Sequence, residues 1–194
     1  MGDGMAFDRD EPIAEYKPIN NESVDVRDVD HHSAFAVLKK KGWFTTVYFL
    51  EQRLANDTLA GRYTLFGGGS DDGESSYEVA VAREVAQETG VVAQPNQYVS
   101  KHFLISTVPG GTKFAVEIFL LDPEIAKRQL SSSAIRRHQA ARAIEAPDDL
   151  VGPPKKIRRF GNFWFFSNWS RLSSIAIYAL LEDCAYDMNR NGHG

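Results

Sequence analysis

Residues 67–75 of the chain read GGGSDDGES, and residues 83–91 read REVAQETGV. The first segment predicts a glycine-rich loop, and the second lies on a helix expected over residues 74–89 that ends at Gly90. Glu84 and Glu88 are four residues apart, so they share one face of this helix. Hard divalent cations prefer oxygen ligands and often contact substrate phosphates as well. The two carboxylates therefore predict a cation site beside the loop, and a solvated helix face is the alternative.

This pattern resembles the signature of the Nudix hydrolases, G-x5-E-x7-R-E-U-x-E-E-x-G-U, in which U is a bulky aliphatic residue. The positions of the second segment that fit the signature are Arg83, Glu84, Val85, Glu88, Gly90 and Val91. The resemblance implies an α/β fold, namely a Nudix-like α/β/α sandwich with a mixed β-sheet between helices.

The chain departs from this signature at two places. Counted from Gly69, Ser75 occupies the position of the first Glu; counted from Gly68, Glu74 occupies it, with one extra residue before the arginine. Gln87 replaces the first Glu of the Glu-Glu pair. An amide oxygen brings no negative charge, so we expect weaker metal binding, or fewer ions, than a full Glu pair would give.

The resemblance assigns metal-binding roles to several of these residues. Glu84 and Glu88 are expected to bind Mg²⁺, with Mn²⁺ as an alternative ion, and Gln87 can add a neutral oxygen. In the family a backbone carbonyl before the signature glycine often joins the metal. That carbonyl belongs to Gly67 in one count and to Gly68 in the other.

The implied reaction is hydrolysis of the diphosphate linkage in a nucleoside diphosphate joined to another moiety. The chain would then be a Nudix-type pyrophosphohydrolase with a small nucleotide substrate. A bound cation would neutralise the phosphates, and a carboxylate would orient or deprotonate the attacking water. Glu84, Glu88 and Glu117 are the candidates for that carboxylate. Arg83 is expected to pair with Glu74 and hold the loop against the helix.

Glu117 is a candidate because of its neighbours on a predicted strand. Its side chain shares a face with apolar residues, where a carboxylate is costly unless it is paired or liganded. The alternative is an edge strand that leaves Glu117 in water. A different function class also stays open, because Gln87 and the irregular helix start suit a weakened Nudix-like module that senses a nucleotide or a partner.

The composition of the chain limits its domain number, its redox compartment and its relation to membranes. The 194-residue chain is 43% hydrophobic, which suffices for one domain with a substantial core. Its single cysteine, Cys184, excludes an intrachain disulfide and agrees with a reducing compartment. No apolar run is long enough to span a membrane, and the polar, acidic first residues do not resemble a signal peptide. The expected location is the cytoplasm, with no membrane partner.

Charge is unevenly distributed along the chain. Residues 1–30 carry nine acidic and three basic side chains, which predicts an acidic N-terminal arm. Residues 31–194 are expected to form a single Nudix-like domain that includes a C-terminal helix. Residues 125–171 hold ten basic against three acidic residues. This excess suggests a solvated surface or a rim that attracts a nucleotide. Nucleic acid is a disfavoured third option, because no nucleic-acid motif accompanies the charge.

Hydrophobic periodicity and turn residues predict the other elements. Strands are expected at residues 34–39, 43–50 and 62–66, and a hairpin at residues 98–108 and 112–121. Helices are expected at residues 123–146, interrupted near residues 131–133, and at residues 170–187, whose apolar stripe is compatible with a homodimer. Residues 146–154 are expected to form a loop.

An aromatic run follows this loop. It contains Phe160, Phe163, Trp164, Phe165, Phe166 and Trp169. Lys155, Lys156, Arg158 and Arg159 precede it. Such rings can stack on a base while the cations hold its phosphates, or they can pack in the core or in a dimer contact.

Overall fold

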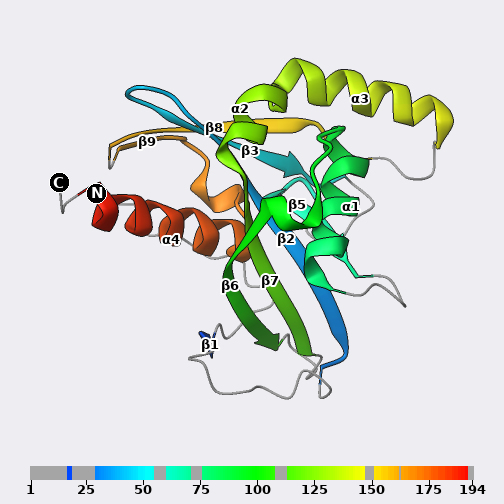
Figure 1. The fold of residues 1–194 in the computed structure, drawn as a ribbon, viewed down its shortest axis with the longest axis horizontal. Helices are drawn as coiled ribbons and strands as arrows, with labels where there is room; N and C mark the ends of the chain where they lie inside the picture. The colour runs from blue at the N-terminus through cyan, green and yellow to red at the C-terminus, as the bar shows by residue number, and fades with distance from the viewer. Residues whose placement is uncertain are drawn as a thin grey trace.

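The computed structural model describes residues 17–18, 29–54, 60–70, 76–107, 113–146, 151–161 and 163–191. Their centre is a mixed β-sheet in the order β1-β6-β7-β2-β3-β8-β9, with β5 paired to β2 and β4 to β3 (Figure 1). β2 runs parallel to β7, and its pairings with β3 and β5 are antiparallel. The strands are β1 Lys17–Pro18, β2 His31–Lys41, β3 Thr46–Gln52, β4 Tyr63–Thr64, β5 Phe66–Gly69, β6 Tyr98–Thr107, β7 Lys113–Leu121, β8 Pro154–Phe160 and β9 Phe163–Phe165.

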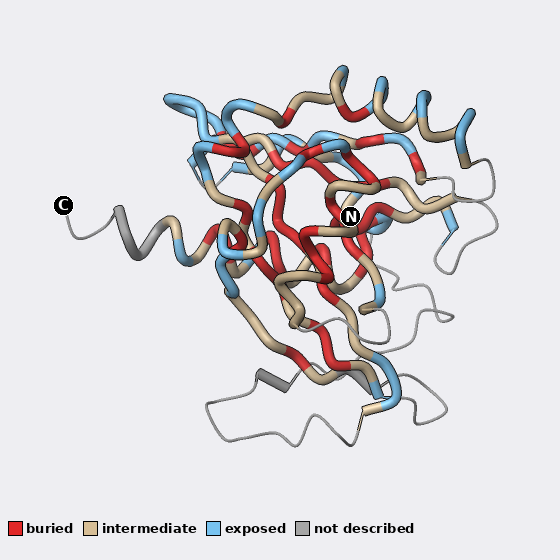
Figure 2. Tube along the Cα trace, turned by 45° about the vertical axis from the view of Figure 1, so that its right-hand side comes forward, coloured by how far each residue is buried: buried red, intermediate tan, exposed pale blue. Residues whose placement is uncertain are grey.

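Helices cover both faces of this sheet. They are α1 Tyr77–Thr89, α2 Pro123–Gln129, α3 Ser132–Glu145 and α4 Ser174–Asn191. The first three pack on one face, where Ala36 and Phe66 of the sheet meet Val85 of α1. α4 packs on the other face, where Leu50 meets Leu180. The strands therefore lie buried between two helical layers (Figure 2), which confirms the predicted α/β/α sandwich.

Helix α1 is bounded by local sequence. Ser76 caps its start by accepting a hydrogen bond from the Val79 amide at 3.4 Å. Gly90 ends it in the left-handed region with φ 73°, the conformation that glycine adopts most easily. The helix thus begins at Tyr77, whereas the predicted start, Glu74, lies outside the described residues.

A buried ionic network fixes α4 to the sheet. Lys39 of β2 lies 2.6 Å from one oxygen of Asp183 and 2.7 Å from the other. Tyr48 of β3 donates to the same carboxylate at 2.8 Å. Arg159 of β8 donates to Tyr48 and pairs with Asp187. The cations of β2 and β8 are thus paired with carboxylates of α4, and this pairing offsets part of the cost of burying the charges. No helix within the described ranges is long and apolar enough to cross a membrane.

Several predicted boundaries were wrong. Trp43 and Phe44 lie in the turn between β2 and β3 instead of starting a strand, because β3 begins at Thr46. Three of the glycines expected in a loop form β5, paired with β2. The run that follows the loop expected at residues 146–154 forms β8 and β9, which extend the sheet beside β3. The hairpin of β6 and β7 and the break between α2 and α3 were predicted correctly.

Candidate functional site

The site is built on two glycines of β5 that lie against the sheet and against α1. Gly67 has φ 135°, and a Cβ there would lie 2.2 Å from the Ala34 carbonyl oxygen. A Cβ on Gly68 would lie 3.0 Å from the Glu84 carboxylate. Only glycine meets the first demand, because both the dihedral angle and the space exclude a side chain. The second glycine lets the Glu84 carboxylate approach the strand closely.

Both predicted carboxylates of α1 reach this strand. Glu88 accepts a hydrogen bond from the Gly67 amide at 2.8 Å through Oε2, and its side chain is buried. Glu84, one turn earlier, lies beside Gly68. Glu84 accepts a hydrogen bond from Arg83 at 2.6 Å through Oε1. The structure therefore brings Gly67, Glu84 and Glu88 together, as the sequence predicts.

Negative charge accumulates around Glu88. Burial is the main cause that raises the pKa of Glu88 well above its usual range, and the Glu51 and Glu84 carboxylates raise it further. The hydrogen bond from Gly67 and the charge of Arg53 lower the pKa of Glu88, but they do not cancel these effects. A divalent cation at this place would offset the repulsion between the carboxylates.

Glu51 and Arg53, at the end of β3, are site residues that the sequence reading missed. Glu51 is buried, accepts a hydrogen bond from the Gly152 amide at 3.3 Å, and pairs with Arg53 at 3.2 Å. The available indication was an acidic residue directly after the apolar run of residues 47–50. Such a residue is costly to bury unless it has partners.

Arg83 connects α1 to the end of β5. Its guanidinium donates to Glu84 at 2.6 Å and to the Gly69 carbonyl oxygen at 3.0 Å. It also donates to the Gln87 side-chain oxygen at 3.3 Å, so this oxygen is directed toward Arg83. The expected pairing of Arg83 with Glu74 lies outside the described residues.

Glu117 lies farther from the two helix carboxylates. Ala34 of β2 is paired with Gly68 on one side and with Glu117 of β7 on the other, so a whole strand separates the two positions. β7 lies between β6 and β2, so the alternative of an edge strand was wrong. Burial, together with the charge of Glu78, raises the pKa of Glu117, whereas a hydrogen bond from Ser100 lowers it. Its charge also affects Tyr77, whose pKa burial raises to about 12.

The donor set around β5 suits Mg²⁺. This ion takes oxygen ligands, keeps several water molecules, and needs only one or two protein carboxylates. No group of three or more His, Cys, Asp or Glu side chains in the described ranges is close enough to enclose a metal ion. Glu84, Glu88 and a carbonyl of the glycine strand lie close enough together to supply oxygen ligands to such an ion.

Helix α3 fixes the end of α1 that carries these residues. His138 contacts the Gln87 backbone oxygen at 2.8 Å, and Arg142 donates to the same oxygen at 3.2 Å. Gln139 bridges the backbone oxygens of Glu88 and Gly152 at 3.3 and 3.0 Å. Cationic and donor groups at a helix C-terminus satisfy carbonyls that have no partner within the helix. The geometry of the carboxylates thus depends on α3.

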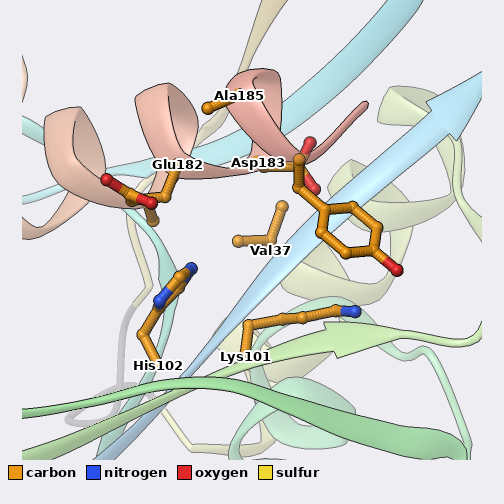
Figure 3. Close-up of a pocket in the computed structure, with 8 residues that line it drawn as sticks. Val37, Lys101, His102, Glu182, Asp183 and Ala185 are labelled. Carbon is orange, nitrogen blue, oxygen red and sulfur yellow. The ribbon is translucent and has the colours of Figure 1, made fainter. Parts of the chain in front are cut away.

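A cavity of about 270 Å³ adjoins the glycine strand from the α4 side of the sheet. Arg53, Thr64 and the start of α4 at Ser174 line it together with the glycines. A second cavity of similar volume lies between β6 and α4 (Figure 3). Lys101, His102, Glu182 and Asp183 line this second cavity. Glu84 and Glu88 line neither cavity, and of the two only the first is lined by the glycine strand.

The aromatic run of residues 160–169 divides between two environments. Trp164, Phe166 and Trp169 pack against the core under α4. Phe160 and Phe163 are exposed instead. The run therefore does not form a single base-stacking surface.

The Nudix domain model matches residues 30–156, and the chain belongs to this family. The matched range includes β2, the glycine strand and the whole of α1. None of the curated proteins compared with the chain matches it.

Solved structures share the fold at low sequence identity. A MutT/nudix family protein from Enterococcus faecalis is 14% identical, with a TM-score of 0.54 over 86% of this chain and 63% of that chain. A NUDIX hydrolase from Nitrosomonas europaea is 18% identical, with a TM-score of 0.51 over 80% of this chain and 88% of that chain. Shewanella oneidensis NrtR complexed with a 27mer DNA is 18% identical, with a TM-score of 0.50 over 80% of this chain and 60% of that chain. This chain thus spans less than two thirds of the Enterococcus and Shewanella proteins.

Proposed function

We propose that the chain is a Mg²⁺-dependent pyrophosphohydrolase that cleaves the diphosphate linkage of a nucleoside diphosphate joined to another moiety. The observation that carries this proposal is the approach of two helix carboxylates to the glycine strand, with Glu88 bonded to Gly67 and Glu84 packed on Gly68. Membership of the Nudix family supports the same class of reaction.

In the proposed reaction, Glu84 and Glu88 bind the cation, and Arg83 and the Gly67 amide orient these two carboxylates. When bound, the cation would neutralise the diphosphate and activate the attacking water. Arg83 holds Glu84 by a 2.6 Å hydrogen bond and ties the helix to Gly69. The Gly67 amide holds Glu88. Fixed carboxylates lose less entropy on binding a metal and substrate than mobile ones would.

Proton transfer from water is assigned to one of the two helix carboxylates. Glu84 and Glu88 are placed beside β5, whereas Glu117 is one strand farther away. A general base must lie within hydrogen-bond reach of the proton that it removes, directly or through one water molecule. Glu117 then takes a supporting role toward substrate on the β7 side of the site.

The second candidate function is nucleotide sensing without turnover. Gln87 favours it, because the side-chain oxygen that replaces a carboxylate already accepts a hydrogen bond from Arg83. Such a module would keep the nucleotide site and bind fewer cations.

A panel assay distinguishes the two functions. The protein is incubated with Mg²⁺ or Mn²⁺ and with dinucleotides, nucleotide sugars, ADP-ribose and nucleoside triphosphates, and the products are separated by chromatography. Glu84→Gln and Glu88→Gln remove charge at nearly constant shape. Glu124→Gln on α2, which is exposed, is the matched control for loss of one carboxylate.

The enzyme requires metal-dependent turnover that falls by at least about a hundredfold in both site variants, as expected when a group that orients the reacting atoms is lost. The control variant should match the unmodified protein. Nucleotide binding without turnover, with affinity independent of metal, would establish the sensor. Turnover that survives in both site variants would remove the carboxylates from the reaction.

A further inference from the structure

Five exposed aromatic side chains gather at the ends of two neighbouring hairpins. Their exposed fractions are large: Trp43 92%, Phe44 69%, Phe160 46%, Phe163 74% and Phe165 64%. We call these five residues the aromatic tip. Large apolar side chains that cluster on a surface mark an interaction site more often than isolated ones do.

The fold brings the two hairpins together. β3 and β8 are antiparallel partners with Thr46 opposite Arg159, so the β2–β3 turn lies beside the β8–β9 turn (Figure 1). The Phe44 ring is 6.1 Å from the Trp43 ring and 6.3 Å from the Phe160 ring. Phe160 is paired with Phe163 across the second hairpin. Residues more than a hundred positions apart in sequence thus form one apolar surface.

The exposed charges of the two segments that form the aromatic tip have one sign, whereas Asp183 and Asp187 of α4 approach them from the buried side and are paired with Lys39 and Arg159. Residues 31–50 and 150–181 contain no Asp or Glu, although the whole chain has 26 acidic and 22 basic residues. Lys41, Lys156 and Arg158 are exposed in these two segments. Arg158 lies opposite Phe165, and Lys156 is set back from the turn along β8. The surface therefore combines apolar rings at its end with cations behind them.

We propose that the aromatic tip docks the protein onto an anionic lipid surface. Trp43, Phe44 and Phe163, at the turns, would enter the interface between headgroups and acyl chains, where aromatic rings are favoured. Lys41, Lys156 and Arg158 would then lie at the level of the negative headgroups. This function is separate from hydrolysis, because the glycine strand and its carboxylates lie on other elements of the fold.

Charge argues against a second copy of the chain as the occupant. A two-fold symmetric contact through the aromatic tip would bring its own cations face to face, with no acidic partner from either segment. Single-stranded nucleic acid would use the same rings and cations, so binding of an oligonucleotide is measured beside binding of vesicles.

Flotation with vesicles tests the proposal on the full chain. Vesicles of pure phosphatidylcholine are compared with vesicles of phosphatidylcholine mixed with phosphatidylglycerol. Trp43→Ala combined with Phe44→Ala removes both rings of the β2–β3 turn. Its control is Ile144→Ala near the end of α3, where the side chain is 84% exposed and does not belong to the aromatic tip. Lys156→Gln with Arg158→Gln removes two cations, and Arg136→Gln with Arg137→Gln on α3 is the control.

The unmodified protein should float with the anionic vesicles and much less with the neutral ones. The ring variant should lose at least about tenfold in affinity, since bound apolar area contributes to interfacial binding. Loss of two cations should lower the affinity roughly thirtyfold. Both controls should bind normally, and thermal melts should confirm that all variants fold.

Three results would overturn the proposal. The first is equal binding of the ring variant and the unmodified protein. The second is binding to a labelled single-stranded oligonucleotide with no binding to anionic vesicles. The third is a dimer in sedimentation that the ring variant abolishes, again without vesicle binding. A blue shift of the Trp43 emission on anionic vesicles only, absent in Trp43→Phe, would support insertion of the rings.

Discussion

Alanine substitutions at Gly67 and Gly68 of β5 should distinguish an effect on stability from an effect on metal binding and turnover. At Gly68 a Cβ meets only the carboxylate end of the Glu84 side chain, at 3.0 Å, so this carboxylate must shift by a few tenths of an ångström. We expect Gly68→Ala to lower the stability by less than about 1 kcal/mol. Metal affinity and turnover should fall roughly tenfold, because a displaced ligand no longer matches the octahedral geometry of Mg²⁺.

Gly67→Ala provides the contrast. The backbone has φ 135°, and a Cβ would lie 2.2 Å from the Ala34 carbonyl oxygen and 2.7 Å from the Phe35 Cα. The dihedral angle alone costs about 1–3 kcal/mol for a residue other than glycine. The contact is with backbone, which no rotamer change relieves, so we expect a total loss of at least about 3 kcal/mol.

Two measurements on each variant test this pair. Urea denaturation followed by circular dichroism gives the free energy of unfolding, and calorimetric titration with Mn²⁺ gives the metal affinity. If Gly68→Ala binds metal and turns over substrate as well as the unmodified protein does, the approach of Glu84 to this strand is irrelevant to the site. If Gly67→Ala is as stable as the unmodified protein, the strain argument is wrong.

Three further changes test other parts of the structure. Asp183→Asn leaves Lys39 with a weaker partner in a buried place, and we expect a loss of about 3 kcal/mol in urea denaturation. Burial lowers the pKa of His102 below 6.5, and Lys101 lowers it further, although Glu182 and Asp183 oppose this shift. The unfolded state then binds the proton more readily, so stability should fall as pH drops through 6.5, less steeply in His102→Gln. Gln87→Glu should tighten Mg²⁺ binding in calorimetry, because it adds a negative charge beside Arg83 and the site.

Each of these changes has a control and a contrary result. Glu182→Gln, next to Asp183, should keep the free energy of unfolding within about 0.5 kcal/mol of that of the unmodified protein. A loss below about 1 kcal/mol in Asp183→Asn would show that the ionic network contributes little to stability. The exposed His31→Gln should keep the pH dependence of the unmodified protein. An unchanged slope in His102→Gln would assign that dependence to other groups. Unchanged metal affinity in Gln87→Glu would place residue 87 outside the site.

The parts of the fold with strong local patterns were predictable. α1 carries a cap, an apolar stripe and a terminal glycine, so both its position and its acidic face could be read from the sequence. The pairing of Glu84 and Glu88 at β5 followed from the same pattern. In contrast, β8 and β9 read as a basic stretch followed by an aromatic run, because their pairing depends on β3, which is far away in the chain and pairs with β8, which in turn pairs with β9.

The missed site residues have the same explanation. Glu51 and Arg53 act on Glu88 only because the end of β3 lies near the end of α1 in space. The local indication, an acidic residue directly after the apolar run of residues 47–50, does not show which side chains surround Glu51 in space. The aromatic tip likewise requires Phe44 and Phe160 to meet across two hairpins, a contact that depends on strand order and that no window of sequence contains.

The Glu88 side chain accepts a hydrogen bond from the Gly67 amide and is also a proposed metal ligand. β5 is paired only with β2 among the described strands, so this carboxylate satisfies a backbone donor on the strand's open side, as a further strand would. Truncation of Glu88 to alanine would leave that buried amide without its hydrogen-bond acceptor, at a cost of about 1–3 kcal/mol in stability. The effect of an alanine substitution on activity would then combine the destabilisation of the sheet with any loss of metal binding. Under the proposed function, any replacement at this position must be a good hydrogen-bond acceptor for the backbone and a good metal ligand.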